Sequence, residues 1–381
     1  MKLPENYRQL ILWLWREGPM SRWELHERTG ATPNAIGSVA AALMAEGLVR
    51  EAEVRVASGG RPRVPLEIDP FQRHVIGLAI SAQGVEICRL NLLGNLLESA
   101  VFAPAASCDE LVSTAHALLS RHFNDRTLAV GLSATGFVDP RSQCILFDSV
   151  APGQRTLSLN SIYDLARAVP LILENDLHAL AARWSLTHRA PADEDVLLVY
   201  FRDGSLGAAM LVDGKPNRGC IVSANELGHM RLAVETDRCL CGHVGCLERI
   251  VSSEFLRRHG AGPAASLLEQ ARSFDGANAP LETVLRHLAT GLANAVNFMR
   301  PHRLVVVSEM TRFPVFTDHL LRLTRGQLLK ELSDLVRIDI WDQPATRSAE
   351  TAGYLALANL YGDGWQEVDS MEPSQPVRPA R

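Results

Sequence analysis

Short apolar runs alternate with amphipathic helical segments between residues 71 and 365, and this alternation restricts the fold more than any other feature of the chain. The runs "HVIGLAI", "GVEICRLNL" and "LLESAVF", separated by short turns, predict three antiparallel strands. Further strand patterns alternate with helical ones, and the last helical pattern is the small-residue segment "SAETAGYLALANLY". Strands that alternate with helices predict an α/β fold built from layers of sheets and helices.

The first 70 residues show a different pattern, in which three helices follow one another closely. Apolar residues around Leu10 recur at helical spacing and predict the first helix. Ser21 and Glu24 form a capping box at the start of a second helix, which ends at Gly30. Thr32 caps a third helix, whose apolar stripe leaves the opposite face small and polar.

Two strand patterns follow the third helix and enclose the Gly-rich tip "ASGGRP". Three helices and such a hairpin predict a winged helix-turn-helix over residues 1–70, whose third helix would enter the major groove of DNA. The alternative is a small protein-interaction domain. Residues 1–65 carry a net charge of +2 in a chain of net charge −5, which permits contact with nucleic acid. The candidate DNA contacts are Thr32, Asn34, Gly37, Ser38, Arg61 and Arg63.

Length and composition limit the class of protein. The chain has 381 residues, 47% of them hydrophobic, so it can bury a large core and is expected to form two or three domains. No apolar run approaches the roughly 18 to 20 residues of a membrane helix, and the N-terminus lacks the pattern of a signal peptide. We therefore expect a cytoplasmic protein without a membrane partner. The seven cysteines form an odd set, which favours reduced thiols over a disulfide framework.

The segment "ELGHMRLAVETDRCLCGHVGCLERI" concentrates residues that bind metals. His229, Cys239, Cys241 and Cys246 have the spacing H-x9-C-x-C-x4-C. Three thiolates and one imidazole are a ligand set of tetrahedral Zn²⁺, and four protein ligands leave no open position for water. We therefore expect a structural zinc ion and no catalytic metal. His243 is an alternative ligand, and a group of unrelated buried thiols is the alternative to a metal site.

The chain resembles the ROK family of bacterial repressors and sugar kinases over roughly residues 5–360, in the branch of the xylose and N-acetylglucosamine repressors. The most specific motif is "ELGHM…CLCGHVGCLE", and "TGFVDP", "ENDLHALAA" and "LVDGKPNRG" match weaker family segments. The resemblance implies a winged helix followed by a two-lobed, actin-like ROK domain over residues 71–365. We expect the first lobe at 71–175 and 346–362 and the second at 176–345. The polar tail 366–381 is expected to be disordered.

The resemblance also assigns residues to a sugar site. Asn175 and Asp176 match an Asn-Asp pair that contacts sugar hydroxyls, and the Asp is the catalytic base in the family's kinases. His229 would touch both the metal and the sugar. Carboxylates and amides suit a polyol because they offer directional hydrogen bonds. The expected sugar contacts are Gly136, Asn175, Asp176, Glu226, His229 and Glu248.

Three departures from the kinase pattern concern the nucleotide. The D-x-G-G-T turn of the family's kinases is replaced by residues 79–83, "AISAQ". The G-T-G-I-G-G-G loop is replaced by residues 203–209, "DGSLGAA", and the late glycine run by residues 308–310. Phosphate loops need unobstructed backbone N–H groups, and a nearby carboxylate such as that of Asp203 repels phosphate. These changes predict that the sugar site is retained and the nucleotide site is lost.

The sequence therefore predicts a transcriptional regulator, a repressor of carbohydrate genes, and no enzyme. It would bind operator DNA as a homodimer or homotetramer and respond to a sugar or sugar phosphate. One alternative is an ATP-dependent sugar kinase with a fused DNA-binding domain, which the presence of Asp176 favours. Another is a metal-responsive regulator, although a closed Cys₃His site is coupled to folding more often than to sensing.

Overall fold

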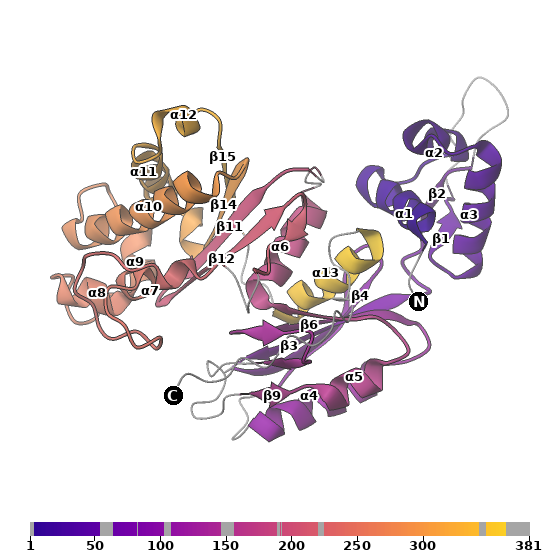
Figure 1. Cartoon of the computed structure of the whole chain (residues 1–381), viewed down its shortest axis with the longest axis horizontal. Helices are drawn as coiled ribbons and strands as arrows, with labels where there is room; N and C mark the ends of the chain where they lie inside the picture. The colour runs from indigo at the N-terminus through magenta and orange to yellow at the C-terminus, as the bar shows by residue number, and fades with distance from the viewer. Residues whose placement is uncertain are drawn as a thin grey trace. The chain divides into compact units, whose positions relative to one another are not determined.

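The computed structural model describes residues 4–53, 64–81, 83–102, 108–145, 156–188, 191, 193–219, 225–342 and 348–362. Internal contacts divide the chain into two units. Unit 1 comprises Met1–Arg189 and Arg347–Arg381, and unit 2 comprises Ala190–Thr346. Both units combine a five-stranded sheet with helices (Figure 1), which confirms the predicted α/β class.

Unit 1 begins with helices α1 (Glu5–Glu17), α2 (Arg22–Thr29) and α3 (Pro33–Ala45). They are followed by the antiparallel strands β1 (Val49–Glu51) and β2 (Leu66–Ile68), the element order of a winged helix-turn-helix. The capping box of Ser21 and Glu24 is formed, and the Thr32 hydroxyl accepts a bond from the Ala35 N–H at 3.3 Å. Arg61 and Arg63 lie outside the described residues.

The sheet of unit 1 has the strand order β10-β6-β3-β4-β5. As predicted, β3 (His74–Ser81), β4 (Gly84–Asn91) and β5 (Leu96–Phe102) are antiparallel neighbours. Strand β6 (Thr127–Ala134) runs parallel to β3, and β10 (Leu171–Asn175) runs parallel to β6. The short strands β7 (Val138–Asp139), β8 (Cys144–Ile145) and β9 (Leu157–Ser158) form a small sheet of their own.

Helices cover both faces of this sheet (Figure 1). Helices α4 (Cys108–His122) and α5 (Asn160–Ala166) share a core with alternate residues of β3, such as Ile76 and Leu78. The C-terminal helix α13 (Ser348–Tyr361) covers the other face and also contacts α6 (Asp176–Thr187). A Cβ at Gly77 would lie 1.9 Å from the Ala349 carbonyl oxygen, so α13 packs directly on the sheet backbone.

The sheet of unit 2 has the strand order β13-β12-β11-β14-β15. Strand β11 (Val196–Arg202) pairs antiparallel with β12 (Ser205–Val212), which pairs with β13 (Lys215–Pro216). Strands β14 (Arg303–Val307) and β15 (Arg337–Trp341) continue the sheet in parallel. The helices of this unit are α7 (Leu247–Ile250), α8 (Ser253–Arg258), α9 (Leu267–Arg272), α10 (Ala279–Met299), α11 (Pro314–Arg325) and α12 (Lys330–Ser333).

Two features differ from the expected organisation or add to it. Helix α6 belongs to unit 1, because it packs against α13, whereas the sequence put the start of the second lobe at residue 176. Strand β15 at the sheet edge has a partly exposed sequence without a clear apolar pattern.

Within the described ranges, no helix is both long and apolar enough to cross a membrane.

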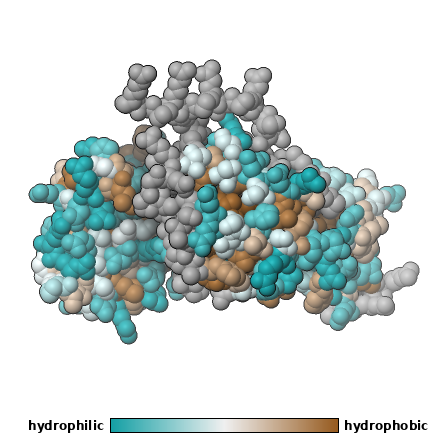
Figure 2. All heavy atoms as spheres, turned by 90° about the horizontal axis from the view of Figure 1, so that it is seen from below, coloured by the Kyte–Doolittle hydropathy of each residue, from teal (hydrophilic) through white to brown (hydrophobic). Residues whose placement is uncertain are grey.

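Hydrophilic residues cover much of the face in Figure 2, and several apolar residues gather among them. Edge strand β5 contributes exposed apolar side chains to the surface of unit 1, including Leu97 and Val101. Single exposed apolar residues are usual on folded proteins.

Candidate functional site

The four predicted metal ligands come together in unit 2. The ligand atoms of His229, Cys239, Cys241 and Cys246 all lie within 4.8 Å of one another. His229 ends the 3₁₀ helix η1 (Leu227–His229), and Cys246 directly precedes α7. Cys239 and Cys246 are buried, whereas Cys241 is exposed. The spacing seen in the sequence therefore corresponds to one compact donor set.

The distances within this cluster fit a tetrahedral ion. The Cys241 and Cys246 sulfurs are 3.5 Å apart, and the Cys239 sulfur is 3.5 Å from Nδ1 of His229. Bonds of about 2.3 Å to a tetrahedral zinc ion would separate two sulfurs by roughly 3.8 Å. His243 lies 3.7 Å from the Cys241 sulfur through its Nδ1, but it is exposed and outside the set of four.

The thiols of the cluster differ in acidity because their surroundings differ. Hydrogen bonding from the backbone at His243 lowers the pKa of Cys241 to about 6. Burial raises the pKa of Cys246 to about 12 and also raises the pKa of Cys239. Two thiolates in a buried position need a cation beside them, and a bound metal ion supplies that charge.

The backbone around the cluster is held by its own contacts. Gly245 has φ +83°, and a Cβ there would lie 2.5 Å from the Leu232 carbonyl oxygen. Its N–H donates to the Thr236 hydroxyl at 2.8 Å, and its carbonyl accepts from the Leu232 N–H at 2.8 Å. Only glycine fits this conformation and this space, so the loop reaches its geometry through Gly245.

Two predicted sugar contacts lie next to the group of four predicted metal ligands. Glu226 directly precedes η1, and its carboxylate lies 3.8 Å from Nε2 of His229, the nitrogen that is turned away from Cys239. Glu248 lies in the first turn of α7, where one oxygen accepts from the Leu206 N–H at 3.4 Å. Its other oxygen is 3.8 Å from the Cys239 sulfur. The structure thus groups Glu226, His229 and Glu248 around the cysteine loop.

The other predicted sugar contacts lie together in unit 1, where parallel strands β6 and β10 end side by side. The Asn175 amide donates to the Gly136 carbonyl at 2.8 Å, and its oxygen caps α6 by accepting from the Leu177 N–H at 2.9 Å. Asp176 follows in the first turn of α6 and accepts from the Thr135 hydroxyl at 3.3 Å. Polar groups at the carboxyl ends of strands are typical of ligand sites in α/β folds.

The sequence interpretation missed a buried hydrogen-bonded pair next to these residues. Glu174 and His178 are 1% and 4% exposed, and Nδ1 of His178 is 3.0 Å from the Glu174 carboxylate. Their i,i+4 spacing across the start of α6 was the available signal. A buried pair of this kind fixes the strand-to-helix junction that carries Asn175 and Asp176.

Comparison with known proteins decides the family. The ROK family matches residues 75–360 of this chain. The chain belongs to the ROK family. Among curated ROK relatives, the "DNA-binding transcriptional dual regulator NagC" of Escherichia coli (strain K12) is 23% identical over 323 residues, covering 77% of this chain and 78% of NagC. The "DNA-binding transcriptional repressor Mlc" of that strain is 24% identical over 351 residues, covering 84% of this chain and 85% of Mlc.

Solved ROK structures have the same fold. A ROK family transcriptional regulator, described as a homolog of E. coli MLC protein, superposes with a TM-score of 0.76 at 20% identity, covering 93% of this chain and 96% of that one. A ROK family glucokinase from Streptomyces griseus, solved with glucose and AMPPNP, has a TM-score of 0.59 at 20% identity. It covers 74% of this chain and 99% of the glucokinase. These likenesses confirm the actin-like ROK fold.

The predicted DNA contacts in the described part of the ROK chain lie at the start of α3. Thr32 is the N-cap, and the side chains of Asn34 and Ser38 are exposed on the face opposite the buried Ile36. Gly37 lies between them on the same helix and is partly exposed. These positions leave small and polar groups free to approach a ligand.

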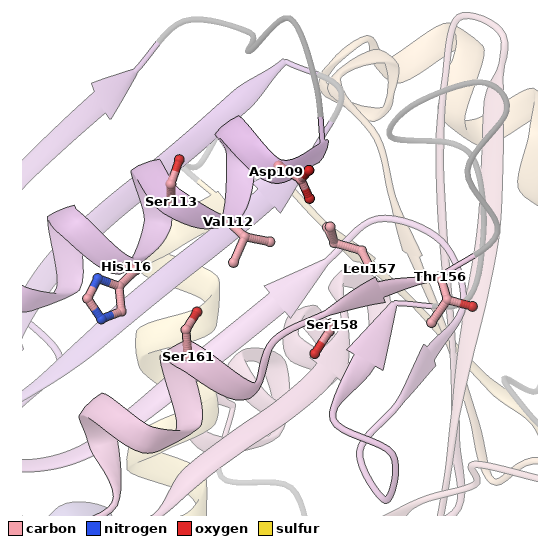
Figure 3. Close-up of a pocket in the computed structure, with 8 residues that line it drawn as sticks. All are labelled: Asp109, Val112, Ser113, His116, Thr156, Leu157, Ser158 and Ser161. Atoms are coloured by element: carbon pink, nitrogen blue, oxygen red, sulfur yellow. The ribbon is translucent and has the colours of Figure 1, made fainter.

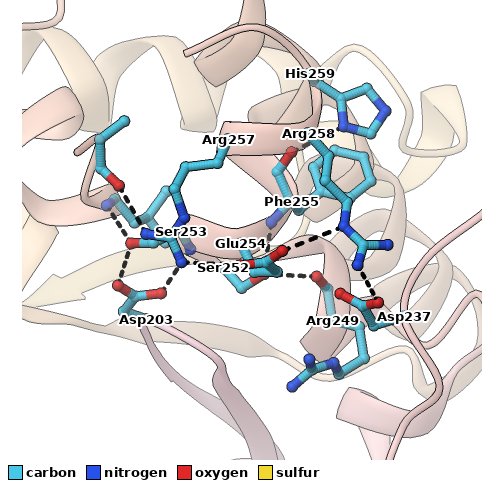
Figure 4. Close-up of polar contacts among 12 residues, drawn as sticks. Asp203, Asp237, Arg249, Ser252, Ser253, Glu254, Phe255, Arg257, Arg258 and His259 are labelled. Carbon is cyan, nitrogen blue, oxygen red and sulfur yellow. Dashed lines mark hydrogen bonds and ion pairs between the residues drawn. The ribbon is translucent and has the colours of Figure 1, made fainter. Parts of the chain in front are cut away.

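The loop over residues 203–209, which the sequence predicted to replace one ROK phosphate loop, makes structural contacts in this chain. Asp203 and Gly204 form the turn between β11 and β12, and Gly204 has φ +70°. The Asp203 carboxylate accepts from the Ser253 N–H at 2.6 Å and from the Ser253 hydroxyl (Figure 4). The carboxylate therefore accepts a hydrogen bond from a backbone N–H at the start of α8, a group that has no partner within the helix.

A pocket of about 490 Å³ lies elsewhere in unit 1, between α4, β9 and α5 (Figure 3). Asp109 and His116 of α4 line it from one side, and Ser158 and Ser161 line it from the other. None of the sugar, metal or DNA contacts predicted from the sequence is among the residues that line this pocket.

Proposed function

We propose that this ROK protein is a transcriptional repressor that binds operator DNA through its first 70 residues and responds to a sugar or sugar phosphate. The observation that carries the proposal is the combination of an N-terminal helical region with a ROK domain in which polar residues proposed as sugar contacts lie together within each unit. Curated relatives that match 77% and 84% of this chain bear names of DNA-binding regulators and repressors. The xylose repressor of Bacillus subtilis (strain 168), 24% identical over 317 residues, is another.

The proposed sugar contacts form two sets of residues, one within each unit. In unit 1, Asp176 offers an acceptor, and the Asn175 amide is already oriented by Gly136 and by its cap on α6. In unit 2, Glu226 and Glu248 offer carboxylates beside His229. A polyol that pairs with such groups gains directional hydrogen bonds, and an analogue that lacks one hydroxyl leaves its polar partner unpaired.

Zinc is the proposed metal, with His229, Cys239, Cys241 and Cys246 as its ligands. The donor set and its distances fit zinc, and the Glu226 carboxylate lies 3.8 Å from Nε2 of His229, on the side where metal-bound imidazoles commonly have a carboxylate neighbour. A bound zinc ion supplies structural support to the loop that carries His229 and Glu248. These two side chains then keep fixed positions for the sugar.

The proposal includes no catalysis. Phosphoryl transfer rests on a positioned nucleotide, and Asp203 occupies one position of the ROK phosphate loops with a carboxylate. At the late glycine run, Ser308 is buried and caps the 3₁₀ helix η2 (Glu309–Arg312) by accepting from the Met310 N–H at 3.2 Å. Asp176, which matches the catalytic base of the family's kinases, accepts hydrogen bonds from the hydroxyls of the bound sugar.

A homodimer or homotetramer follows from the proposed DNA binding. Two recognition helices of a dimer read half-sites about one helical turn, or about 34 Å, apart. A sugar changes operator affinity only if it binds two conformations of this assembly with different affinity.

Calorimetry with glucose, xylose, N-acetylglucosamine and their phosphates, on metal-loaded protein, tests the sugar site. We expect at least one of them to bind the parent protein and to bind Asp176→Asn at least about tenfold more weakly, because a lost charged acceptor costs roughly 1.5–3 kcal/mol. Asp164→Asn, an exposed acid on α5, is the matched control and is expected to bind like the parent. Equal affinity in all three proteins contradicts the site, and ADP release with any of these sugars contradicts the absence of catalysis.

A further inference from the structure

Helix α6 has a proposed sugar contact at one end and a contact with the DNA-binding region at the other. Its first residue is Asp176, and Asn175 is its N-cap. Near its last turn, the Leu186 carbonyl accepts a hydrogen bond of 3.1 Å from Nε1 of Trp15. Trp15 belongs to α1, the first helix of the region proposed to bind DNA. A helix of 12 residues is about 18 Å long.

The contact between Trp15 and α6 is specific. The last four carbonyls of a helix have no partner within it, and the Leu186 carbonyl is one of these. The indole N–H of Trp15 satisfies that carbonyl, so separating α1 from α6 would leave a partly buried acceptor and a donor unpaired.

A second contact fixes the same tryptophan. The ring of Trp15 lies against the ring of Tyr361 near the end of α13, with centroids 5.1 Å apart. Tyr361 is 2% exposed, and its hydroxyl donates to the Leu92 carbonyl at 2.5 Å. Because α13 also packs on the sheet backbone at Gly77 and Gly131, Tyr361 is held in the packed core of unit 1.

The N-terminal end of α6 is equally well connected to the proposed sugar contacts. The Asn175 side chain joins the Gly136 carbonyl to the first turn of the helix, and Thr135 bonds Asp176. The middle of α6 is buried through residues such as Ala181 and Trp184. A buried helix moves as a unit, because close packing resists local bending.

We infer that α6 transmits sugar occupancy from Asn175 and Asp176 to the DNA-binding region through the bond between Trp15 and the Leu186 carbonyl. A sugar that binds at the first turn of α6 shifts the whole helix. The Leu186 carbonyl then moves relative to Trp15, whose ring is held by Tyr361. This inference rests on the proposed function, because it explains how the same sugar site changes DNA affinity.

The test compares two tryptophans of the same helix. Trp15→Phe removes the indole donor and keeps an aromatic ring. Trp13→Phe is the matched control, because Trp13 contacts Arg28 of α2, with the guanidinium carbon 5.3 Å from the ring centroid. The DNA is a duplex selected for parent binding from random sequences, and the sugars are those of the calorimetry panel.

We expect the sugar to change the operator affinity of the parent and of Trp13→Phe by at least about fivefold, the lower range of allosteric coupling. In Trp15→Phe the change should fall below about twofold while calorimetry shows that the sugar still binds. An unchanged response in Trp15→Phe, or equal losses in both variants, overturns the inference. A sugar that fails to bind the parent overturns the proposed function, and the calorimetry tells this apart from a failure of α6.

Hydrogen exchange on the parent protein gives a test without substitutions. The panel sugar that binds is expected to change exchange at both ends of α6 and in the last turn of α1. A change confined to the first turn of α6, with none around residues 185–188 and none in α1, overturns the inference.

Discussion

At the scale of single residues, the cysteine loop is where sequence and structure agree most closely. The spacing of His229, Cys239, Cys241 and Cys246 was sufficient to predict the donor set, because two glycines with positive φ let a short loop turn tightly enough to bring these side chains together. The Glu174 and His178 pair could not be predicted with the same certainty. A buried acid and a buried histidine are recognised only when the strand-to-helix junction brings them together.

Cys241→Ser should remove zinc from the protein. A neutral hydroxyl replaces the thiolate, so we expect the metal affinity to fall by at least about 100-fold, beyond the effect of losing a supporting contact. Zinc content per chain, measured by elemental analysis after gel filtration, reports the change. Cys144→Ser, a buried cysteine of β8 outside the cluster, is expected to keep its metal. Equal zinc content in the two variants contradicts the ligand assignment.

His74 should make the stability of unit 1 depend on pH. Burial is the largest cause that lowers the pKa of His74 from 6.5 to about 4; Arg89 and Arg126 also lower it, and Asp125 opposes them. The unfolded chain then binds the proton more readily between pH 6.5 and pH 4, so the free energy of unfolding falls as the pH drops through this window. The loss is at most about 3.5 kcal/mol, from about 1.4 kcal/mol per pKa unit.

Thermal unfolding between pH 7 and pH 4.5 checks this effect. His74→Gln should flatten the fall in unfolding temperature, because the side chain that takes up the proton is gone. His302→Gln is the control, since the His302 side chain is 65% exposed, and it should follow the parent. A parent and a His74→Gln variant with the same pH dependence would show that another group is responsible.

At the scale of elements, local signals predicted the structure where they were complete. The capping box at Ser21, the cap at Thr32 and the three antiparallel strands all formed as expected. The position of α6 was not predictable, because an apolar stripe requires burial but does not say which layer provides it. The contact of α6 with α13 decides that α6 belongs to unit 1. The hydrogen bond from Trp15 to the Leu186 carbonyl joins residues 171 positions apart, and no local sequence pattern indicates it.

Gly77→Ala should destabilise the protein strongly. The added Cβ would lie 1.9 Å from the Ala349 carbonyl oxygen and 2.4 Å from the Gly353 nitrogen, so α13 would have to move off the sheet. We expect a loss of about 3 kcal/mol or more in the free energy of unfolding, measured by urea denaturation. Gly37→Ala is the control, because no atom lies within 4 Å of its added Cβ, and it should gain about 0.5–1 kcal/mol. A stable Gly77→Ala variant would contradict the close packing of α13.

At the scale of the whole molecule, the proposed function combines DNA binding by the first 70 residues with a ROK domain that binds a sugar as an effector and not as a substrate. The sequence predicted this division because each part has its own pattern, and the ROK family match covers residues 75–360. Arg61 and Arg63, expected at the tip of the wing, lie outside the described residues, so their contacts with DNA stay a prediction.

Asn34→Ala should lower the affinity for the operator and leave the affinity for unrelated DNA unchanged. Asn34 is exposed at the start of α3, where a side-chain amide can read a base edge, and such a contact contributes about 1–3 kcal/mol of discrimination. Asn160→Ala, an exposed asparagine at the start of α5, is the matched control. Filter binding with operator and unrelated duplexes measures both affinities. Equal losses on both duplexes would show that Asn34 contacts the phosphate backbone.

The operator affinity of the zinc-loaded protein, measured by fluorescence anisotropy with and without each sugar of the panel, tests the central claim most directly. The account predicts that at least one sugar changes the dissociation constant by about fivefold or more in the absence of ATP, within the usual range of coupling between two sites. An operator affinity that no sugar alters, although the protein binds one of them, would contradict it.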